Sequence, residues 1–245
     1  MIHPPISLKP YGNHALLVEW PNEVSEIILD SILDFEDFLR KDCLEEAEWE
    51  TISAYNSLLL VNPSVEIDYE NFESKIYEWY EQSKEAPKRP QLLWKLPVSY
   101  DVSFGIDLEE VSKNIGKSVE EVIELHTSNI YTVYGIGFLP GFMYLGGVHK
   151  DLETPRKATP RLKVAKGAVG IAGKQTGIYP QESPGGWNII GNCPVPLFDK
   201  AKDDPCFVNV GDRIQFQQVS KGEHELHKIE AEVGIYKPEK VVLDA

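Results

Sequence analysis

The sequence predicts an α+β fold in which an N-terminal α+β domain, residues 1–88, precedes a β-rich domain, residues 89–245. Before residue 81, short apolar runs alternate with apolar residues at helical spacing, which is typical of mixed secondary structure. Residues 81–92 are polar and include two prolines, as at an exposed domain boundary. Residues 138–199 hold 10 of the 18 glycines and 7 of the 17 prolines, a density that favours short strands and turns.

The N-terminal domain is predicted to contain two strands and two helices. The apolar runs at residues 14–20 and 57–61 predict the strands. Between them, apolar side chains recur every three or four positions over residues 24–39, which predicts an amphipathic helix with Asn22 as its N-cap. Asp68 precedes a second segment with helical spacing and is expected to cap it.

The second domain is predicted to open with a strand over residues 92–100 and then two short helices. Asp107 with Glu110, and Ser118 with Glu121, have the spacing of capping boxes, in which each side chain bonds the other residue's backbone N–H. From residue 130 onward the helical period disappears. The remainder is therefore expected to be mostly β, in the form of a barrel.

Charge and composition argue against several classes of protein. The formal net charge of −15 argues against a nucleic-acid partner or an anionic membrane surface. No apolar stretch approaches the length of a membrane span or a signal peptide, so we expect a cytoplasmic protein. The cysteines, Cys43, Cys193 and Cys206, are widely spaced, so we expect them to be reduced and structural, and no metal site is predicted.

Residues 137–199 carry a net positive charge, whereas the rest of the chain is strongly negative. They carry seven Lys and Arg against four acids, a net +3, whereas the remainder carries −18. This reversal indicates an anionic ligand such as a carboxylate or phosphate, although a solvated basic loop would have the same composition. Arg156 and Arg161 are the stronger candidates, because each follows a proline that stiffens the backbone, whereas Lys163 is expected to be a surface charge.

Two other patterns in the sequence resemble known sites without matching them fully. Five residues separate Gly167 from Gly173, and Gln175 stands where a phosphate-binding loop needs Ser or Thr, so this segment is not predicted to be such a loop. His224 and His227 have the spacing of two metal ligands on a helix, but they lie in a charged run without a third ligand. We interpret that run as a solvated turn.

Long motifs in this region carry a family resemblance. The stretches GFLPGFMYLGG, TPRKATPR, GIAGKQTGIYP, SPGGW and LFD lie within residues 137–199, and the resemblance spans most of residues 96–216. The sequence resembles the family whose members are variously called 5-oxoprolinase B subunits, Kip-type histidine-kinase inhibitors and allophanate hydrolase subunit 1. This resemblance implies an N-terminal α+β domain followed by a cyclophilin-like β-barrel.

The resemblance also implies a function. It implies a subunit that converts 5-oxoproline, ATP and water to glutamate, ADP and phosphate together with a C subunit and an A subunit, the ATP and its Mg²⁺ being shared with the partner. Combined with the charge pattern, it points to Arg156 and Arg161 as sources of positive charge, Gln175 as a hydrogen-bonding residue, and Phe142 and Tyr179 as pocket walls. No residue is assigned as the catalytic base.

The sequence departs from the family pattern at two places, and two alternative functions remain to be distinguished. Ala165-Lys166 replaces a usual Pro-Ala, and Ala168 a usual Ser, so that a proline and a hydroxyl are lost. Asn192-Cys193 replaces a usual Arg/Lys-Thr, which puts any ligand contact at that position in question. A binding module that inhibits a sensor histidine kinase would need only an exposed surface. A carboxyltransferase-like component of a urea- or allophanate-degrading system would bind biotin instead.

Overall fold

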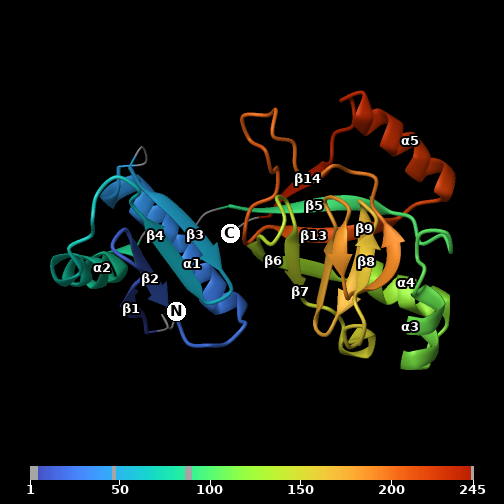
Figure 1. The fold of residues 1–245 in the computed structure, drawn as a ribbon, viewed down its shortest axis with the longest axis horizontal. Helices are drawn as coiled ribbons and strands as arrows, with labels where there is room; N and C mark the ends of the chain where they lie inside the picture. Colours follow the sequence, from blue (N-terminus) through green and yellow to red (C-terminus); the bar gives the residue numbers. More distant parts are fainter. Residues whose placement is uncertain (1–4, 46–47, 86–89, 244–245) are drawn as a thin grey trace. The chain divides into compact units, whose positions relative to one another are not determined.

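The computed structural model describes residues 5–45, 48–85 and 90–243 of the chain. The chain divides into two compact units, with the boundary between Pro90 and Gln91 (Figure 1). Residues 86–89, the centre of the polar segment expected at a domain boundary, lie outside the described residues. That residues 1–88 and 89–245 fold as independent domains stays a prediction, which limited proteolysis of this segment would test.

The N-terminal unit contains a four-stranded antiparallel sheet with the order β1-β2-β4-β3. Its strands are β1 (Ser7–Pro10), β2 (Ala15–Glu19), β3 (Glu50–Ala54) and β4 (Ser57–Val61). Both expected strands are confirmed as β2 and β4, whose Leu16, Val18, Leu58 and Leu60 are buried. This alternation of buried and more exposed residues is that of a sheet with one face against the core.

The helices of this unit are α1 (Glu26–Phe38), which continues as a π-helical turn (Leu39–Cys43), and α2 (Tyr69–Ser83). The expected cap at Asn22 is wrong, because α1 begins later, with Ser25 as its N-cap. Asp68 is confirmed as the cap of α2, where its carboxylate accepts a hydrogen bond from the backbone N–H of Asn71. Both helices place residues in the same core as the sheet.

The β-rich unit is built on an eight-stranded sheet with the order β12-β9-β10-β7-β6-β13-β5-β14. The strands are β5 (Gln91–Val98), β6 (Ile130–Ile136), β7 (Met143–Gly146), β9 (Ala168–Ala172), β10 (Gln175–Ile178), β12 (Asn188–Asn192), β13 (Arg213–Gln218) and β14 (Glu239–Leu243). A separate pair joins β8 (Arg161–Val164) to β11 (Ser183–Gly185). Neighbouring strands are antiparallel except for the parallel pair β5 and β13.

The expectation of a mostly β region is confirmed, but the strand pairing does not close a barrel. Among the described residues, β12 and β14 are the edges of the eight-stranded order. One isolated bridge joins Ser99, the residue after β5, to Asn192 at the end of β12. The sheet therefore curls back toward itself without the continuous ladder that full closure needs.

Three α-helices accompany this sheet, α3 (Leu108–Ile115), α4 (Val119–Ser128) and α5 (Lys221–Glu232), with a short 3₁₀ turn at Lys150–Leu152. The capping box of Ser118 and Glu121 is confirmed at the start of α4. The interpretation of the histidine-containing run as a solvated turn is wrong, because it forms α5, which begins with a capping box of Ser220 and Glu223. Within the described segments, no helix is both long and apolar enough to span a membrane.

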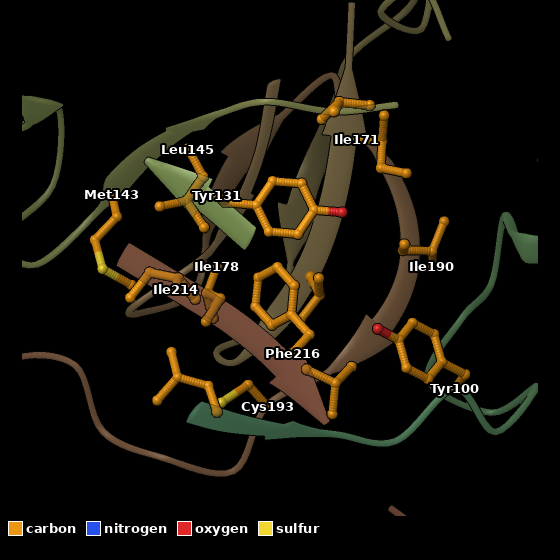
Figure 2. Packing of buried hydrophobic residues seen from close by; sticks show 14 of the residues in the cluster. Tyr100, Tyr131, Met143, Leu145, Ile171, Ile178, Ile190, Cys193, Ile214 and Phe216 are labelled. Atoms are coloured by element: carbon orange, nitrogen blue, oxygen red, sulfur yellow. The ribbon is translucent and has the colours of Figure 1, made fainter. Parts of the chain in front are cut away.

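The larger of two apolar clusters in the described part of the β-rich unit has Tyr131 and Phe216 near its centre (Figure 2). Their rings lie 5.4 Å apart, and both are almost wholly buried. Cys193 is also buried in this cluster, which agrees with a structural role for this cysteine. Close packing of side chains from distant strands fixes the curvature of the sheet and so positions the loops at its rim.

One polar network crosses this apolar interior. His126 of α4 is fully buried, and its Nδ1 lies 2.6 Å from the hydroxyl of Tyr100 and its Nε2 3.0 Å from that of Thr176. Thr176 donates its only hydroxyl proton to the carbonyl of Gly170, so Nε2 of His126 carries the ring proton and donates to Thr176. Tyr100 then donates to Nδ1. Both ring nitrogens are thus satisfied, and the network ties α4 to the sheet.

Candidate functional site

Three of the five residues expected to bind substrate lie around one small pocket. The pocket has a volume of about 130 Å³ and is lined by Arg156, Phe142 and Tyr179 together with Phe138, Tyr144, Pro184, Gly185, Gly186 and Trp187. These residues come from the loop before β7, from β7, from the loop before β8, and from β11 and the segments on both sides of it. The glycine- and proline-rich region of the sequence therefore supplies the whole lining.

The walls of this aromatic pocket are rigid. Phe142, Tyr179 and Trp187 are all nearly buried. The ring of Phe142 lies 5.5 Å from that of Tyr179 and 5.5 Å from that of Trp187, both in edge-to-face contact. Such contacts between buried rings hold each side chain in one orientation. The guanidinium carbon of Arg156 lies 5.9 Å from the centre of the Trp187 ring, so a cation stands beside the aromatic face.

Two backbone features shape the mouth of the pocket. Phe138 has a φ of 67° although it is not glycine, and 69% of its surface is exposed. A bulky residue in the left-handed region is strained, and such strain is often found at binding sites. Gly185 packs directly under Tyr179, where a Cβ atom would lie 2.3 Å from the phenolic oxygen. Any larger residue at this position would displace Tyr179 from the pocket wall.

Arg161, the fourth expected residue, is held by a buried carboxylate. Its Nη2 donates to Oδ1 of Asp107 at 2.5 Å, and the ammonium of Lys157 lies 3.0 Å from the same oxygen. The other carboxylate oxygen of Asp107 accepts the backbone N–H of Ile189 at 2.7 Å. Lys157 also pairs with Glu110 at 2.6 Å. This rim network joins the start of α3 to the basic segment.

The capping box expected at Asp107 and Glu110 is wrong. Asp107 occupies the N-cap position of α3, but its side chain makes no capping hydrogen bond because it faces Arg161 instead. Burial alone would raise the pKa of Asp107, yet the hydrogen bonds from Ile189, Arg161 and Lys157 outweigh it and lower the pKa. The carboxylate is therefore ionised and anchors both cations.

The guanidinium of Arg161 is only partly satisfied by this network. Within the part of the chain that the structure describes, its Nη1 is buried and has no hydrogen-bond partner. Burial raises the pKa of Tyr179, and the nearby charges of Arg156 and Arg161 oppose this rise. Tyr179 therefore lies within electrostatic reach of both arginines, while within the rim network the carboxylates of Asp107 and Glu110 balance the charges of Arg161 and Lys157.

Gln175, the fifth expected residue, is not among those that line the aromatic pocket. It lies at the start of β10, half-buried, where its backbone pairs with Ala172 and Gly146. Sequence reasoning missed Asp107 as a site residue because its pattern matched a helix cap. Its strongest partners are 54 and 82 positions away, and the sequence contains no signal for such pairings.

The two departures from the family pattern meet in a second, larger cavity. This cavity has a volume of about 590 Å³, and its lining includes Ala165, Lys166, Asn192 and Cys193. The amide nitrogen of Asn192 donates to the backbone carbonyl of Lys166 at 3.0 Å. The substituted positions thus contact each other across the cavity wall. No cluster of three or more potential metal ligands occurs among the residues with described positions.

The sequence matches the family model described as "Carboxyltransferase domain, subdomain C and D" over residues 6–208. It is also 42% identical over 168 residues to the 5-oxoprolinase B subunit of Bacillus subtilis, covering 69% of this chain and 67% of the relative. The chain belongs to the carboxyltransferase C and D subdomain family and groups with the 5-oxoprolinase B subunits. The resemblance expected from the motifs is thereby confirmed.

Another relative of this carboxyltransferase-family chain is the 5-oxoprolinase B subunit of Escherichia coli O157:H7. It is 42% identical over 148 residues, covering 60% of this chain and 67% of the relative. Among solved structures, the protein TTHA0988 is 32% identical with a TM-score of 0.71 over 84% of this chain, which spans 40% of that longer chain. Family members thus include chains that are more than twice as long.

The likeness of fold extends beyond the close relatives. The urea amidolyase of Kluyveromyces lactis superposes on 98% of this chain with a TM-score of 0.77, at 17% identity and over 16% of its own length. At this identity the likeness shows the fold alone. The fold of this family member is therefore that of a mixed α/β unit also found within much larger enzymes.

Proposed function

We propose that this chain is the B subunit of an ATP-dependent 5-oxoprolinase, which converts 5-oxo-L-proline, ATP and water to L-glutamate, ADP and phosphate. The proposal is supported by identities of 42–49% to three 5-oxoprolinase B subunits. The observation that carries it is the cation of Arg156 beside the aromatic pocket. A site of this kind suits a small ring that carries a carboxylate.

The chemistry of 5-oxoproline matches the aromatic pocket. The substrate is a small, nearly flat lactam ring with one carboxylate, and a pocket of about 130 Å³ can enclose little more than such a ring. The rings of Phe142, Tyr179 and Trp187 offer apolar walls. Arg156, which lines the pocket, offers a guanidinium fork to the carboxylate.

ATP is needed because amide resonance makes the lactam carbonyl resistant to water. In the proposed reaction the lactam oxygen attacks the γ-phosphorus of ATP, a P–O bond forms, and the bond to the bridging oxygen breaks with its electron pair leaving on ADP. Water then adds to the activated carbon, and the C–N bond breaks with a proton passing to the nitrogen, which leaves an acyl phosphate. A second water hydrolyses this acyl phosphate to the carboxylate of glutamate and free phosphate. This chain's contribution would be to bind and orient the lactam, since positioning and charge stabilisation dominate phosphoryl transfer.

The remaining groups are proposed to come from partner subunits of the C and A types. Two large apolar side chains are exposed in this region: Phe138, which lines the pocket, at 69%, and Leu162 on β8, the strand paired with β11, at 87%. Exposed apolar residues near a site often mark a surface that another protein covers. We therefore place the C-type subunit over this rim. Because the reaction consumes ATP, the complex would work in the cytoplasm.

A second candidate function has one observation in its favour. The chain is 30% identical over 155 residues to the urea amidolyase of Saccharomyces cerevisiae, which favours a carboxyltransferase-like role. That match covers 8% of the yeast enzyme, whereas the matches to the 5-oxoprolinase B subunits cover up to 67% of those proteins. The 5-oxoprolinase assignment is therefore the one we adopt. The kinase-inhibitor alternative stays a prediction, which an assay of the assembled subunits also tests.

The test is 5-oxoproline-dependent release of ADP from the chain alone and after addition of its C-type and A-type companions. We expect activity only in the assembled complex. Arg156→Ala should then raise KM for 5-oxoproline by about tenfold to a hundredfold, because a charge-assisted hydrogen bond is worth about 1.5–3 kcal/mol.

Lys163→Ala is the matched control, because Lys163 is 78% exposed and pairs only across the surface with Glu182, at 3.2 Å. It should leave KM unchanged. Equal effects of the two substitutions would contradict the assignment of the pocket. Inactivity of every combination of subunits would contradict the proposed function and favour the kinase-inhibitor alternative.

A further inference from the structure

Arg156 and Trp187 face each other from two separate segments of the β-rich unit. Arg156 lies in the loop before β8, and Trp187 lies between β11 and β12. The guanidinium carbon of Arg156 lies 5.9 Å from the centre of the Trp187 ring, and both residues line the aromatic pocket. Trp187 is 4% exposed, so burial fixes its ring, whereas Arg156 is exposed. The position of Arg156 therefore depends on the backbone that carries it.

One hydrogen bond holds this backbone just after Arg156. The backbone N–H of Lys157 donates to the carbonyl of Gly186 at 2.8 Å, and Gly186 is the residue before Trp187. The ammonium group of Lys157 also lies 3.0 Å from the carboxylate of Asp107. The loop is thus anchored on one side of Arg156 to the segment that carries the aromatic ring.

A second hydrogen bond holds the backbone just before Arg156. The side-chain amide of Asn188, the residue after Trp187, donates to the carbonyl of Pro155 at 2.9 Å. The same nitrogen donates to the carbonyl of Ile171 on β9 at 3.1 Å. The peptide groups on both sides of Arg156 are therefore bonded to the residues on both sides of Trp187. This pairing sets the arginine opposite the ring.

The amide of Asn188 can make these two bonds in one orientation only. Both partners are backbone carbonyls, which accept but cannot donate, so the NH₂ group faces them and gives one proton to each. Asn188 is 3% exposed, and hydrogen bonds in such surroundings are costly to lose. Asn188 is thus a rigid link between the sheet and the loop that carries Arg156.

We propose that Asn188 is a positioning residue of the 5-oxoproline site, which holds the loop at Pro155 so that Arg156 faces a carboxylate bound in the aromatic pocket. The inference rests on the proposed function, in which Arg156 binds that carboxylate. Asn188 is not among the described residues that line the pocket, so it acts through Arg156. A loop that is ordered before binding loses less entropy when the substrate arrives, which strengthens binding.

A double-mutant cycle separates positioning from a general loss of stability. In the assembled complex, Asn188→Ala should raise KM for 5-oxoproline about threefold to tenfold, roughly the worth of one hydrogen bond. It should leave kcat within about twofold, because the carboxylate is not the reacting group. In an Arg156→Ala background the same substitution should change KM by less than about twofold. No rise in KM, or an equal rise in both backgrounds, would overturn the role of Asn188.

Asn62→Ala is the matched control for loss of stability. Asn62 is 4% exposed, and its side chain also makes two hydrogen bonds, from the backbone N–H groups of Ser64 and Val65 in the N-terminal unit. The substitution should lower the urea midpoint, as Asn188→Ala does, but leave KM unchanged. A similar rise in KM in both variants would overturn the positioning role. If Asn188→Ala does not fold, Asn188→Ser, which keeps one donor, allows the same cycle.

The indole resonance of Trp187 reports on Arg156 without catalysis. Arg156→Ala removes the cation beside the ring and should shift the indole signal in ¹H–¹⁵N NMR spectra of the isolated chain, where Trp187→Phe identifies the signal by its loss. In an Asn188→Ala background this shift should fall to about half or less, because Arg156 is then held less often beside the ring. The direct effect of the neighbouring substitution cancels in the comparison. A shift of the same size in both backgrounds would overturn the positioning role.

The two hypotheses fail in different ways. If every combination of subunits is inactive, the proposed function is wrong, and the indole resonance still decides whether Asn188 holds Arg156. If the assembled complex turns over 5-oxoproline but neither the cycle nor the resonance shows coupling between Asn188 and Arg156, the positioning role is wrong while the function stands.

Discussion

The interior of the β-rich unit and its rim each contain a buried polar network, and the two differ in completeness. In the interior, both ring nitrogens of His126 are bonded, to Tyr100 and Thr176. At the rim, Asp107 binds three donors, yet Nη1 of its partner Arg161 is left without one among the described residues. Both networks are buried in low dielectric surroundings, where unmade hydrogen bonds are costly.

This difference distinguishes residues that stabilise the fold from residues that could bind a ligand. A complete network adds stability and offers nothing to a ligand, so His126 is interpreted as a structural residue. An incomplete network retains a donor or an acceptor without a partner. Among the described residues these are Nη1 of Arg161 and Nδ1 of His224, and His224 lines the larger cavity. Substitutions in the two networks should therefore have effects of different kinds and sizes.

The largest effect is expected at Asp107, which is 2% exposed. Asp107→Ala should lower the free energy of unfolding by about 3–5 kcal/mol, because it removes the buried counter-ion of Arg161 and leaves Lys157 with its pair to the exposed Glu110. Urea denaturation of the purified chain measures this. Asp107→Asn keeps an acceptor for the N–H of Ile189 and should cost less. Both variants remove the ion pairs, so equal losses would mean that the hydrogen bond from Ile189 contributes nothing beyond the ion pairs.

The next effect concerns His126 and pH. Burial lowers the pKa of His126 from 6.5 to about 3 in the folded protein. As the pH falls below 6.5, the unfolded chain takes up a proton at this residue while the folded protein does not, so stability decreases until the folded pKa is reached. When the pH is lowered from 7 to 4, His126 alone should lower the free energy of unfolding by about 3 kcal/mol.

His126→Gln removes the titrating group and serves as the comparison for this prediction. Urea denaturation of both proteins at several pH values between 7 and 4 isolates the contribution of His126, because the other titrating groups are common to both. The native chain should lose stability more steeply than the variant. Parallel curves would contradict the interpretation of His126 as a neutral, fully bonded structural residue.

The smallest effect is expected at Ser118, where the hydrogen bonds of the capping box span only three positions. Ser118→Ala should lower the free energy of unfolding by about 1 kcal/mol, the usual cost of losing an N-cap. This is well below the effect at Asp107, although both residues precede a short helix with the same spacing to a glutamate. Thermal and urea unfolding of the two alanine variants under one condition provides the direct comparison. Similar losses in the two variants would contradict the expectation that a buried ion pair contributes more to stability than a local helix cap.

Features that depend on neighbouring residues could be predicted from the sequence. The cap at Asp68 and the box at Ser118 were predicted correctly because a side chain reaches backbone N–H groups three positions away whenever the helix forms. Five residues were predicted as a site from the family resemblance and the charge pattern, and the structure brings three of them, Arg156, Phe142 and Tyr179, to one pocket. The family was identified from motifs within residues 137–199.

Only the tertiary structure could reveal contacts between distant segments. Asp107 looked like a cap, but packing against β12 and β8 gave its carboxylate stronger partners. His224 looked exposed because its neighbours are charged, yet α5 turns this one side chain toward Asn192, 32 positions away. The sequence also predicted a barrel from glycine and proline density, but closure depends on strand register at β12 and β5. The packing of the whole unit decides such pairings. A side chain bonds a distant residue only where that hydrogen bond is stronger than the local one it could make to its own helix or turn.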